Sequence, residues 1–515
     1  MYTLLMDEKI NKLLDNINGY PLDDSQRKVV TSSKKHLLVS AGAGSGKSLT
    51  IIGKIRYLIE IKGFSTSDIL CISFTNDATN SLKDKLINNY GYNITCYTFH
   101  KLGLEILKDE HKKICSSDLL SYVITEYLNA LISQENKKRV LTILGIKHNS
   151  FNFKKKYSSI SKKDLEDLAK LIQKFINLFK AGDYPPEAFT SFINSSKSKR
   201  DKEFLILTYY IYYTYQKELD SKNEIDFSDM ISKATKKVKK YGYSKKLKYI
   251  IIDEFQDTSQ VRFNLIKEIL NKTGASLLVV GDDFQSIYRF TGCDLDLFLG
   301  FKNIFPDSEI LKIENTYRNS LELINIAGDF IMKNKNQLKK ELKSSKRCKY
   351  PLQIIYYNDI IKTFIKLINH IYNKSHKPIL VLGRNNFDIK LLTNSDKFNF
   401  NNDILIYKEN PNIKMKYLTI HRSKGLEEEN VIIINLTNKK TGFPNKINDD
   451  KVLKYVSCHK DNYPHSEERR LFYVAITRTK NITYLLTPKV NESLFITEIR
   501  KNYKNKIKIV RKDKF

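Results

Sequence analysis

The chain has 515 residues, of which 41% are hydrophobic and 28% charged, and 88 basic against 57 acidic residues give it a net charge of +31. This composition is typical of a soluble globular protein with several domains, and no run approaches the roughly 18 apolar residues of a membrane span. The six cysteines form no C-x-x-C pair, which argues against a zinc site or a disulfide framework.

The basic excess favours a polyanionic partner, with nucleic acid first, although an AT-rich coding sequence would also enrich lysine. The first residues, MYTLLMDEKINKLLDN, mix acids with lysines and lack the apolar centre of a signal peptide. We therefore expect a cytoplasmic protein with no membrane partner.

A phosphate-binding loop is predicted near the N-terminus. The β-prone run from His36 to Ser40 leads into the turn AGAGSGKS, and a helix is expected from Lys47. Backbone N–H groups of such a P-loop cradle phosphates, its lysine reaches the β- and γ-phosphates, and its hydroxyl binds Mg²⁺. A Rossmann turn would need glycine at position 47. The expected ATP-binding residues are Ala41, Gly42, Ala43, Gly44, Ser45, Gly46, Lys47 and Ser48, with Lys47 catalytic and Ser48 a metal ligand.

The region from about 110 to 215 carries none of this chemistry. Its amphipathic runs, such as KKDLEDLAKLIQKFINLF at 162–179, predict helices. Its lysine runs FKKKY and SKSKRDK fit either a contact with duplex DNA or a solvated surface. We interpret the region as a helical insertion in a domain whose sheet continues on both sides of it.

Two acids end the next apolar strand, which is predicted at Tyr249 to Ile252. In phosphoryl transfer to water, one carboxylate secures Mg²⁺ and a second orients or deprotonates the attacking water. We assign the metal to Asp253 and the water to Glu254. Further on, Arg318 and Arg478 are candidates for stabilising charge at the γ-phosphate, while as isolated arginines they would be ordinary surface residues.

The apolar run SLLVV at 276–280 is followed by GDDFQSIYRFTG, which combines acids, an amide and two aromatic residues. Aromatic faces hold bases irrespective of sequence, so Tyr288 and Phe290 are candidates for binding single-stranded nucleic acid. The alternative is that both rings are buried in a seam between domains. From about residue 306, the strands PLQIIYY, PILVLGR, YLTIH, NVIIINL and ITYLL alternate with helices, as in a second, mostly parallel sheet.

This ordered series of motifs resembles the UvrD/Rep-like superfamily 1 DNA helicases, and within them the helicase IV subgroup, over most of the chain. LDDSQRKVV resembles the Q motif, DEFQDTS motif II, GDDFQSIYRFTG motif III, TYRNS motif IV, LGRNN motif IVa, LTIHRSKGLEEENVIII motif V and EERRLFYVAITRTK motif VI. The segments TGFPNKINDD and YRFTG favour the subgroup. The departures, which include Asp77, Thr291 and Thr479, remove no catalytic group.

The resemblance implies a role for each matching residue. Gln26, Tyr317 and Glu427 are expected at ATP, the last on its ribose; Gln285 is expected to sense the γ-phosphate, and Arg318 and Arg478 to lie beside it. Gln256 and Asp257 are expected to couple the two sites, and Lys424 to lie near DNA and Mg²⁺. The expected DNA contacts are Phe74, Thr75, Asn76, Thr98, Phe99, His100, Tyr288, Phe290, Arg384, Asn385 and His421.

The resemblance also implies an α/β fold with two RecA-like P-loop domains on parallel sheets. The expected division is 1–109 with 216–305 for the first domain, 110–215 for a helical insertion like the family's 1B subdomain, and 306–515 for the second. Only about twenty-five residues, 388–413, stand where relatives insert a large 2B subdomain. We expect that subdomain to be absent.

The implied function is an ATP- and Mg²⁺-dependent DNA translocase or helicase with 3′→5′ polarity, acting in repair, recombination or phage defence. Its partners would be single-stranded DNA and junctions of single- with double-stranded DNA. Two alternatives stay open. The chain could be the ATPase subunit of a larger nuclease or defence complex, with little unwinding alone, or an unrelated P-loop enzyme such as a small-molecule kinase.

Overall fold

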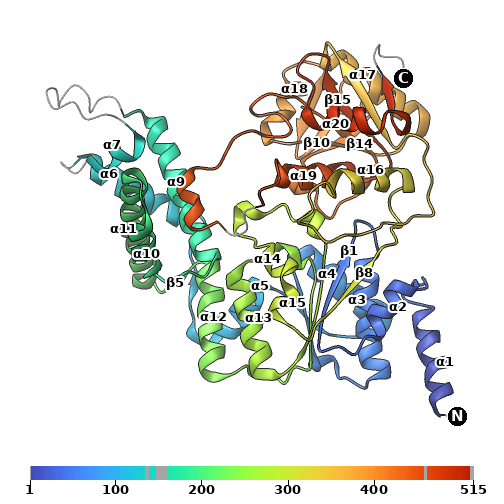
Figure 1. Cartoon of the computed structure of the whole chain (residues 1–515), viewed down its shortest axis with the longest axis horizontal. Helices are drawn as coiled ribbons and strands as arrows, with labels where there is room; N and C mark the ends of the chain where they lie inside the picture. Colours follow the sequence, from blue (N-terminus) through green and yellow to red (C-terminus); the bar gives the residue numbers. More distant parts are fainter. Residues whose placement is uncertain (1, 134–137, 146–159, 458–460, 511–515) are drawn as a thin grey trace.

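The first half of the chain is built on a six-stranded sheet in which all neighbouring strands are parallel. The computed structural model describes residues 2–133, 138–145, 160–457 and 461–510 (Figure 1). The strands follow the order β3 (Thr95–Thr98), β2 (Ile69–Ser73), β6 (Tyr249–Ile252), β7 (Ser276–Gly281), β1 (His36–Ala41) and β8 (Glu309–Ile313).

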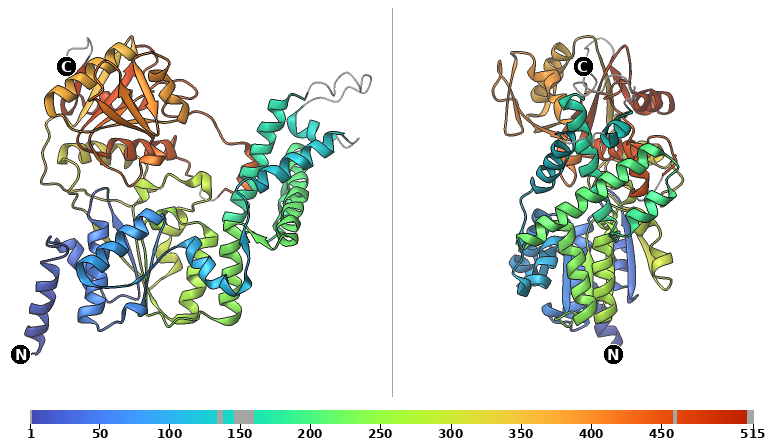
Figure 2. Two further views of the ribbon diagram at one scale, coloured as in Figure 1. Left: turned by 180° about the vertical axis from the view of Figure 1, so that it is seen from behind. Right: turned by 90° about the vertical axis from the view of Figure 1, so that its left-hand side faces the viewer.

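Helices cover both faces of this sheet, so its central strands read as continuous apolar runs (Figure 2). Alternate residues of β1 enter two separate cores, Leu38 on one face and Leu37 with Val39 on the other. The main flanking helices are α1 (Tyr2–Leu14), α2 (Asp24–Thr31), α3 (Lys47–Arg56), α4 (Asn76–Tyr90), α5 (Phe99–Leu107), α12 (Phe227–Tyr241) and α13 (Gln260–Thr273), followed by the short α14 (Asp296–Leu299) and α15 (Phe301–Ile304).

The parallel arrangement explains how distant motifs meet. Because the carboxyl ends of parallel strands share one edge of the sheet, the P-loop after β1 lies beside Asp253 after β6 and Asp282 after β7. Helices start there on threonine caps, since Thr75 accepts from the backbone of α4 and Thr98 from that of α5. The P-loop and the acidic pair Asp253 and Glu254 therefore meet at this edge of the sheet.

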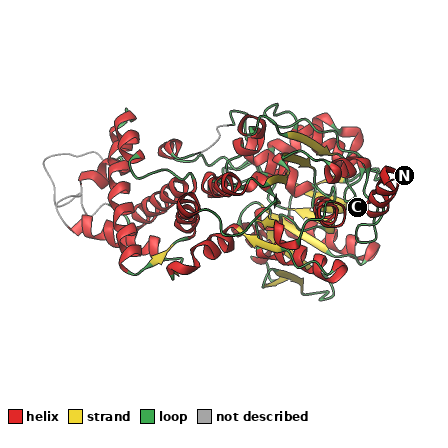
Figure 3. Ribbon diagram, turned by 90° about the horizontal axis from the view of Figure 1, so that it is seen from below, coloured by secondary structure: helices red, strands yellow, loops and turns green. Residues whose placement is uncertain are grey.

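The region expected to be a helical insertion forms a group of helices set apart from the sheets (Figure 3). It comprises α6 (Leu119–Ser133), α7 (Lys138–Leu144), α9 (Lys162–Ala181), α10 (Ala188–Ser195) and α11 (Lys199–Ser221), with β4 (Lys113–Ile114) pairing with β5 (Glu224–Ile225) at its base. The expected limit at 215 is too early, because α11 continues for six more residues before its chain returns to the sheet. The run SKSKRDK leads into α11, and FKKKY lies outside the described residues.

The second domain carries an eight-stranded mixed sheet. Its order is β11 (Phe398–Asn401), β12 (Ile404–Tyr407), β13 (Lys414–Thr419), β10 (Ile379–Gly383), β14 (Glu428–Ile433), β15 (Thr479–Pro488), β9 (Leu352–Tyr357) and β16 (Lys508–Val510). Its helices are α16 (Leu321–Ile331), α17 (Ile360–Ser375), α18 (Lys390–Thr393), α19 (Ser466–Ile476) and α20 (Leu494–Asn502).

Two details differ from the expected division of the chain. Strand β8 lies beyond the expected boundary at 306, yet it pairs with β1 and so completes the first sheet. Between β10 and β13, where a large 2B subdomain was expected to be missing, the chain forms only short turns, α18 and the antiparallel hairpin β11–β12 on the sheet edge.

The two domains share a core at motif III. Phe284 and Ile287 follow β7 of the first sheet, but both are fully buried among residues of α16, α19 and the second sheet. The Phe284 ring meets Tyr473 of α19 edge to face, with 5.4 Å between ring centroids. Motif III therefore joins the two domains physically. Within the part of the chain that the structure describes, no helix is long and apolar enough to cross a membrane.

Candidate active site

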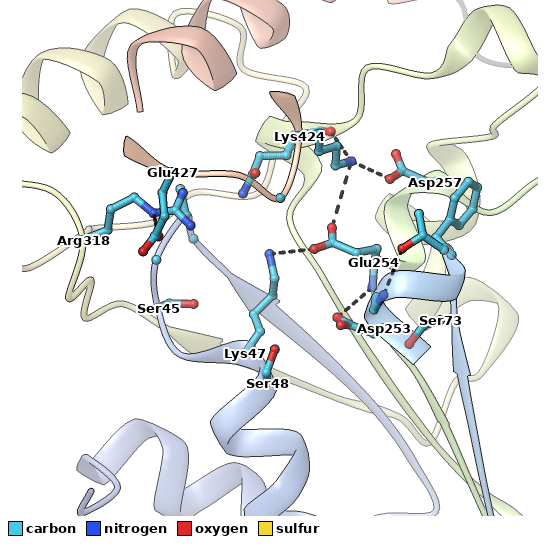
Figure 4. A pocket seen from close by; sticks show the side chains of 18 of the residues that line it. Ser45, Lys47, Ser48, Ser73, Asp253, Glu254, Asp257, Arg318, Lys424 and Glu427 are labelled. Atoms are coloured by element: carbon cyan, nitrogen blue, oxygen red, sulfur yellow. Dashed lines mark hydrogen bonds and ion pairs between the residues drawn. The ribbon is translucent and has the colours of Figure 1, made fainter. Parts of the chain in front are cut away.

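A cavity of about 770 Å³ lies at the junction of the two domains. The first domain contributes the P-loop from Gly42 to Ser48 together with Asp253 and Glu254, and the second domain contributes Lys424, Glu427 and Arg478. Figure 4 shows Lys47, Glu254 and Lys424 pointing toward one another across it. The structure thus brings most of the predicted ATP-site residues into one space.

The P-loop is held from outside by the segment that follows β8. Thr316 donates its hydroxyl to the Ala43 carbonyl at 2.7 Å, and the Tyr317 N–H donates to the Gly44 carbonyl at 2.9 Å. Gly44 has a φ of +70°, and a Cβ there would collide with the Cβ of Arg318. Glycine is therefore required at position 44 both for its backbone conformation and for this close approach.

The acidic pair after β6 has the geometry expected for two different roles. Glu254 has a φ of +53°, which is sparsely populated by residues other than glycine, and its carboxylate lies 3.4 Å from the Lys47 ammonium. Asp253 instead accepts the Glu254 N–H at 2.9 Å. The unusual backbone turns Glu254 toward the centre of the cavity.

Charges in the cavity drive the two pKa values apart. Burial and the neighbouring Glu254 charge raise the pKa of Asp253 to about 6. Burial alone would raise the pKa of Glu254 as well, but Lys47 and Lys424 outweigh it and lower that pKa to about 2. Glu254 is thus ionised at neutral pH. A cation bound beside Asp253 would favour its ionised form, because it would offset the burial of this carboxylate and the neighbouring Glu254 charge.

The residues present fit a hydrated divalent cation. Ser48 and Asp253 both line the cavity, and Ser73 at the end of β2 adds a further hydroxyl that sequence reasoning did not single out (Figure 4). Hard oxygen ligands of this kind, one or two from the protein, are what Mg²⁺ uses beside phosphates. Ser45 is buried, and its hydroxyl has no partner among the described residues.

Both predicted arginines reach the cavity, each held differently. Arg478 is 1% exposed and donates to the Gln285 side chain at 3.1 Å and to the Val474 carbonyl at 3.0 Å. Arg318 donates from Nε to Glu427 at 2.5 Å, and its buried Nη1 has no hydrogen-bond partner among the described residues. Burial, together with the Arg318 charge, lowers the pKa of Arg478 to about 9. An anion between the two guanidinium groups would relieve this repulsion.

Gln285 lines the cavity between the two domains. Its amide nitrogen donates to Asp282 at 2.6 Å, and its oxygen accepts from Arg478. Lys340, from the segment after α16, holds Asp282 and Asp283 in a fully buried cluster with N–O distances of 2.5 and 2.6 Å. One lysine in a lysine-rich chain gives no sequence signal, so Lys340 was missed.

Gln26 and Tyr317 flank the P-loop. Gln26 is fully buried, donates to the Ser45 carbonyl at 3.1 Å and accepts from the Asp23 N–H at 3.0 Å. Its amide thus completes a capping box on α2 and supports the P-loop; it does not line the cavity. Tyr317 does line it and donates to Asp23 at 2.8 Å. The adenine contact of Gln26 remains a prediction that requires these bonds to open.

Gln256 and Asp257, which are expected to couple the two sites, connect motif II to motif III and to the second domain. The Gln256 amide nitrogen donates to Glu254 at 2.5 Å, and its oxygen accepts from the Asp282 N–H at 2.9 Å. Asp257 holds Lys424 at 2.5 Å, and burial raises the pKa of this carboxyl to about 6. Lys424 also donates to the Gln285 carbonyl at 2.8 Å. These bonds link Glu254, motif III and the second domain.

The expected DNA contacts of the first domain divide into surface and core. Thr75 and Asn76 are exposed, and Phe74 lines the cavity with the Arg262 guanidinium 4.5 Å above its ring. Thr98 is buried and caps α5. His100, half-buried, packs on Phe227 with 4.6 Å between ring centroids. The expectation for Phe99 fails for its ring, which is 3% exposed and belongs to the core of the sheet. Arg262 has no family motif to mark it and was missed.

Tyr288 and Phe290 differ from each other in the way that the two sequence hypotheses anticipate. Tyr288 lies in the seam between domains, where its hydroxyl donates to the His421 carbonyl at 2.9 Å and its ring lies below Lys424. Phe290 is 48% exposed, and its ring meets His421 edge to face at 5.3 Å. Phe290 thus offers a free face and Tyr288 does not.

Arg384 and Asn385 follow β10 at the rim of the second domain. Arg384 donates twice to Glu468, at 2.7 and 3.0 Å, and Asn385 donates to the Thr441 carbonyl at 3.1 Å. Both are partly buried and have protein partners. They lie near the surface expected for DNA, and a contact with DNA remains a prediction.

Comparisons with known proteins agree with this geometry. The family model described as the UvrD/REP helicase N-terminal domain matches residues 22–306, and the UvrD-like helicase C-terminal domain matches 398–489. DNA helicase IV of Escherichia coli is 26% identical over 97% of this chain and 73% of its own length. The ATP-dependent DNA helicase Rep of Buchnera aphidicola (from Acyrthosiphon pisum) is 30% identical over 72% of this chain and 55% of Rep. The ATP-dependent DNA helicase PcrA of Staphylococcus aureus is 27% identical over 65% of this chain and 42% of PcrA.

Proposed function

The chain belongs to the UvrD/Rep helicase family, and from that membership we propose that it hydrolyses ATP to move along single-stranded DNA. The direction would be 3′→5′, and strand separation would occur at junctions of single- with double-stranded DNA. The relatives named above are ATP-dependent DNA helicases, and this chain spans only part of each. Roles in repair, recombination or defence, and a nuclease partner, are further hypotheses.

One observation carries the proposal. Cationic groups from both domains line the same cavity, Lys47 from the P-loop and Arg478 from the turn between α19 and β15, with Arg318 on the segment between the domains. A triphosphate held by the P-loop would place its outer phosphate among these groups and bring the domains together. A small-molecule kinase would have no use for an arginine supplied by a second domain beside the P-loop, or for an exposed aromatic ring on the segment that joins the two domains.

Each residue of the site has a task that its geometry supports. Lys47 offsets the charge of the outer phosphates, and the ionised Glu254 orients and deprotonates a water molecule in the cavity. Ser48 and Asp253 would hold Mg²⁺, which would supply positive charge to offset that of the phosphates. Arg318 and Arg478 stabilise charge that develops during transfer.

Motif III converts the state of the nucleotide into grip on the strand. Gln285 is bonded to Arg478, and three residues later Tyr288 is bonded to the backbone of His421. Phe290, at the exposed end of the same segment, presents its ring beside His421. When the arginines shift toward or away from a nucleotide, the position of Phe290 relative to the second domain must therefore change.

The Glu254→Gln variant tests the assignment of the water-orienting group. It should bind ATP with nearly normal affinity, because Lys47 and Asp253 remain, while turnover falls by on the order of 10²–10⁴-fold. The matched control is Glu268→Gln on α13, outside the cavity, which should hydrolyse ATP normally. A Glu254→Gln protein with normal turnover would show that another group activates the water. Weak DNA-stimulated turnover by the unaltered protein alone would instead favour the subunit alternative.

A further inference from the structure

A long segment of the second domain reaches the helical insertion of the first. Residues 441–457, here called the arm, leave the second domain between β14 and α19 and end on the insertion (Figures 1 and 2). Val452, Leu453 and Val456 are at most 2% exposed and lie in the same apolar core as the insertion helices. The Tyr455 ring lies 5.6 Å from that of Phe192. The tip of the arm is therefore packed into the insertion.

Ion pairs surround this apolar contact. Lys174 of α9 lies 2.5 Å from Asp449, and Arg200 of α11 makes two bonds to Asp450 at 2.7 and 3.0 Å. A further ion pair has the basic residue on the arm and the acidic residue on the insertion: Lys454 of the arm lies 3.3 Å from Asp201. The basic run SKSKRDK, which the sequence leaves open between a duplex contact and a solvated surface, extends into α11 and has an acidic protein partner there, because Arg200 pairs with Asp450.

The base of the arm adjoins the expected DNA surface of the second domain. Thr441 accepts from Asn385, and the Asn445 N–H donates at 2.9 Å to Glu468, which also holds Arg384. Two predicted DNA contacts of that domain are therefore held beside the start of the arm, Asn385 directly and Arg384 through Glu468.

The middle of the arm adjoins motif III of the first domain. Arg289 stands between Tyr288 and Phe290 in the chain, and it donates to Asp449 of the arm and to Glu467 of α19, both at 3.0 Å. The same Asp449 carboxylate holds Lys174 of the insertion. One acidic side chain on the arm thus joins the insertion to the segment that carries the exposed Phe290.

These contacts close a circuit around the expected DNA surface. The insertion is covalently part of the first domain, the arm is covalently part of the second, and the two meet at Asp449, Asp450 and Leu453. We propose that single-stranded DNA bound at Phe290 and His421 passes between the arm and the two RecA-like domains, so that the closed circuit encloses the strand. This inference rests on the proposed function, and it explains how the protein would remain bound to single-stranded DNA while it moves.

Enclosure has a consequence that an open groove does not have. A protein in an open groove is held by phosphate contacts, and these weaken steeply as salt releases counterions. An enclosing protein can leave only by sliding off an end or by releasing the arm. Salt should therefore remove it from linear DNA but not from a circle, provided that the arm cannot open.

A cross-link between arm and insertion tests this directly. The protein would carry Lys174→Cys and Asp449→Cys in a background with Cys115, Cys348 and Cys458 replaced by serine. It would first bind circular single-stranded DNA, then be joined by a short bismaleimide, and then be exposed to about 1 M salt, where charges are screened within roughly 3 Å. Gel filtration measures the fraction of protein that stays with the DNA.

We expect the cross-linked protein to stay on the circle at least roughly tenfold longer than on linear DNA of the same length, and to be released when the circle is cut. The single variant Lys174→Cys, treated in the same way, should leave both DNAs equally fast. Equal loss of the cross-linked protein from circle and line would overturn the inference.

A second comparison avoids cross-linking. Asp449→Asn with Asp450→Asn weakens the arm contact without touching the ATP cavity, so ATPase without DNA should be unchanged while dissociation from a long circular strand becomes several-fold faster. The control Lys170→Ala removes an exposed pair on the same face of α9 that does not involve the arm. If the double variant dissociates from the circular strand as slowly as the unaltered protein, the enclosure of DNA is refuted. If the unaltered protein shows no DNA-stimulated ATPase, the proposed function itself is refuted.

Discussion

Replacing Phe290 by alanine separates the DNA side of motif III from its nucleotide side. The Phe290 ring is 48% exposed, and its ring contacts are edge contacts with His421 at 5.3 Å and Tyr288 at 6.1 Å. Such pairs are worth about 0.5–1.5 kcal/mol each, so we expect the variant to lose about 1–3 kcal/mol of stability and to stay folded. Loss of one stacked base costs about 1–3 kcal/mol, which corresponds to roughly 5- to 150-fold weaker DNA binding.

The assay compares three quantities for Phe290→Ala and the unaltered protein. Affinity for a labelled single strand should fall by the stated factor and DNA stimulation of the ATPase should fall with it, while ATPase without DNA stays within about twofold. Phe400→Ala is the matched control, because this ring is 38% exposed on the β11–β12 hairpin. If the folded Phe290→Ala protein binds DNA and unwinds a duplex as well as the unaltered protein, the stacking role is wrong. If ATPase without DNA fails instead, the ring belongs to the domain seam.

The remaining predictions concern the ATP site and pH. Lys47→Ala should reduce hydrolysis to background, because the charge opposite the outer phosphates is lost; normal turnover in a phosphate-release assay would refute this. Arg318→Ala and Arg478→Ala should each lower turnover by on the order of 10³-fold and lower ATP affinity far less, as steady-state kinetics and nucleotide titration can show. If turnover and ATP affinity fall by the same factor, the arginines bind ATP and do not act specifically on the transition state. Burial, with neighbouring positive charge, lowers the pKa of His100 and His421 to about 4, so each stabilises the fold above pH 6.5 and this is lost as pH falls toward 4. Urea unfolding should show a loss of at most about 2 kcal/mol per histidine between pH 7 and 5, and His421→Gln should reduce that loss; an identical pH dependence would contradict the burial argument.

The local parts of the fold and site could be predicted because their signals are local. A β-prone run, a glycine-rich turn and a helix start define the P-loop, and the strand at Tyr249–Ile252 is found with the predicted bounds. Parallel strands then place Lys47 and Asp253 at one edge without further information. The two RecA-like domains were expected from the resemblance to the helicase family, and the helical insertion from the amphipathic runs between the P-loop and Asp253.

What the sequence does not reveal depends on pairing between distant residues. Lys340 and Arg262 have no periodicity or motif, and only the fold shows that one balances two buried aspartates and the other lies over Phe74. The motif gives Phe99 a place near DNA but cannot tell a core ring from an exposed one. For the same reason, β8 was assigned to the wrong side of a boundary, since a strand's partner is set by the sheet and not by its neighbours in the chain.

The central claim is that ATP hydrolysis in the interdomain cavity is coupled to single-stranded DNA held beside motif III. The most direct test is the rate of ATP hydrolysis by the purified protein with single-stranded DNA, with RNA of the same length, and with no polymer, at one salt concentration. We predict a low rate without polymer and a rise of at least roughly tenfold with single-stranded DNA, absent in Lys47→Ala and reduced in Phe290→Ala. A rate that is the same with and without DNA, in a protein that binds both ATP and DNA, would contradict the coupling.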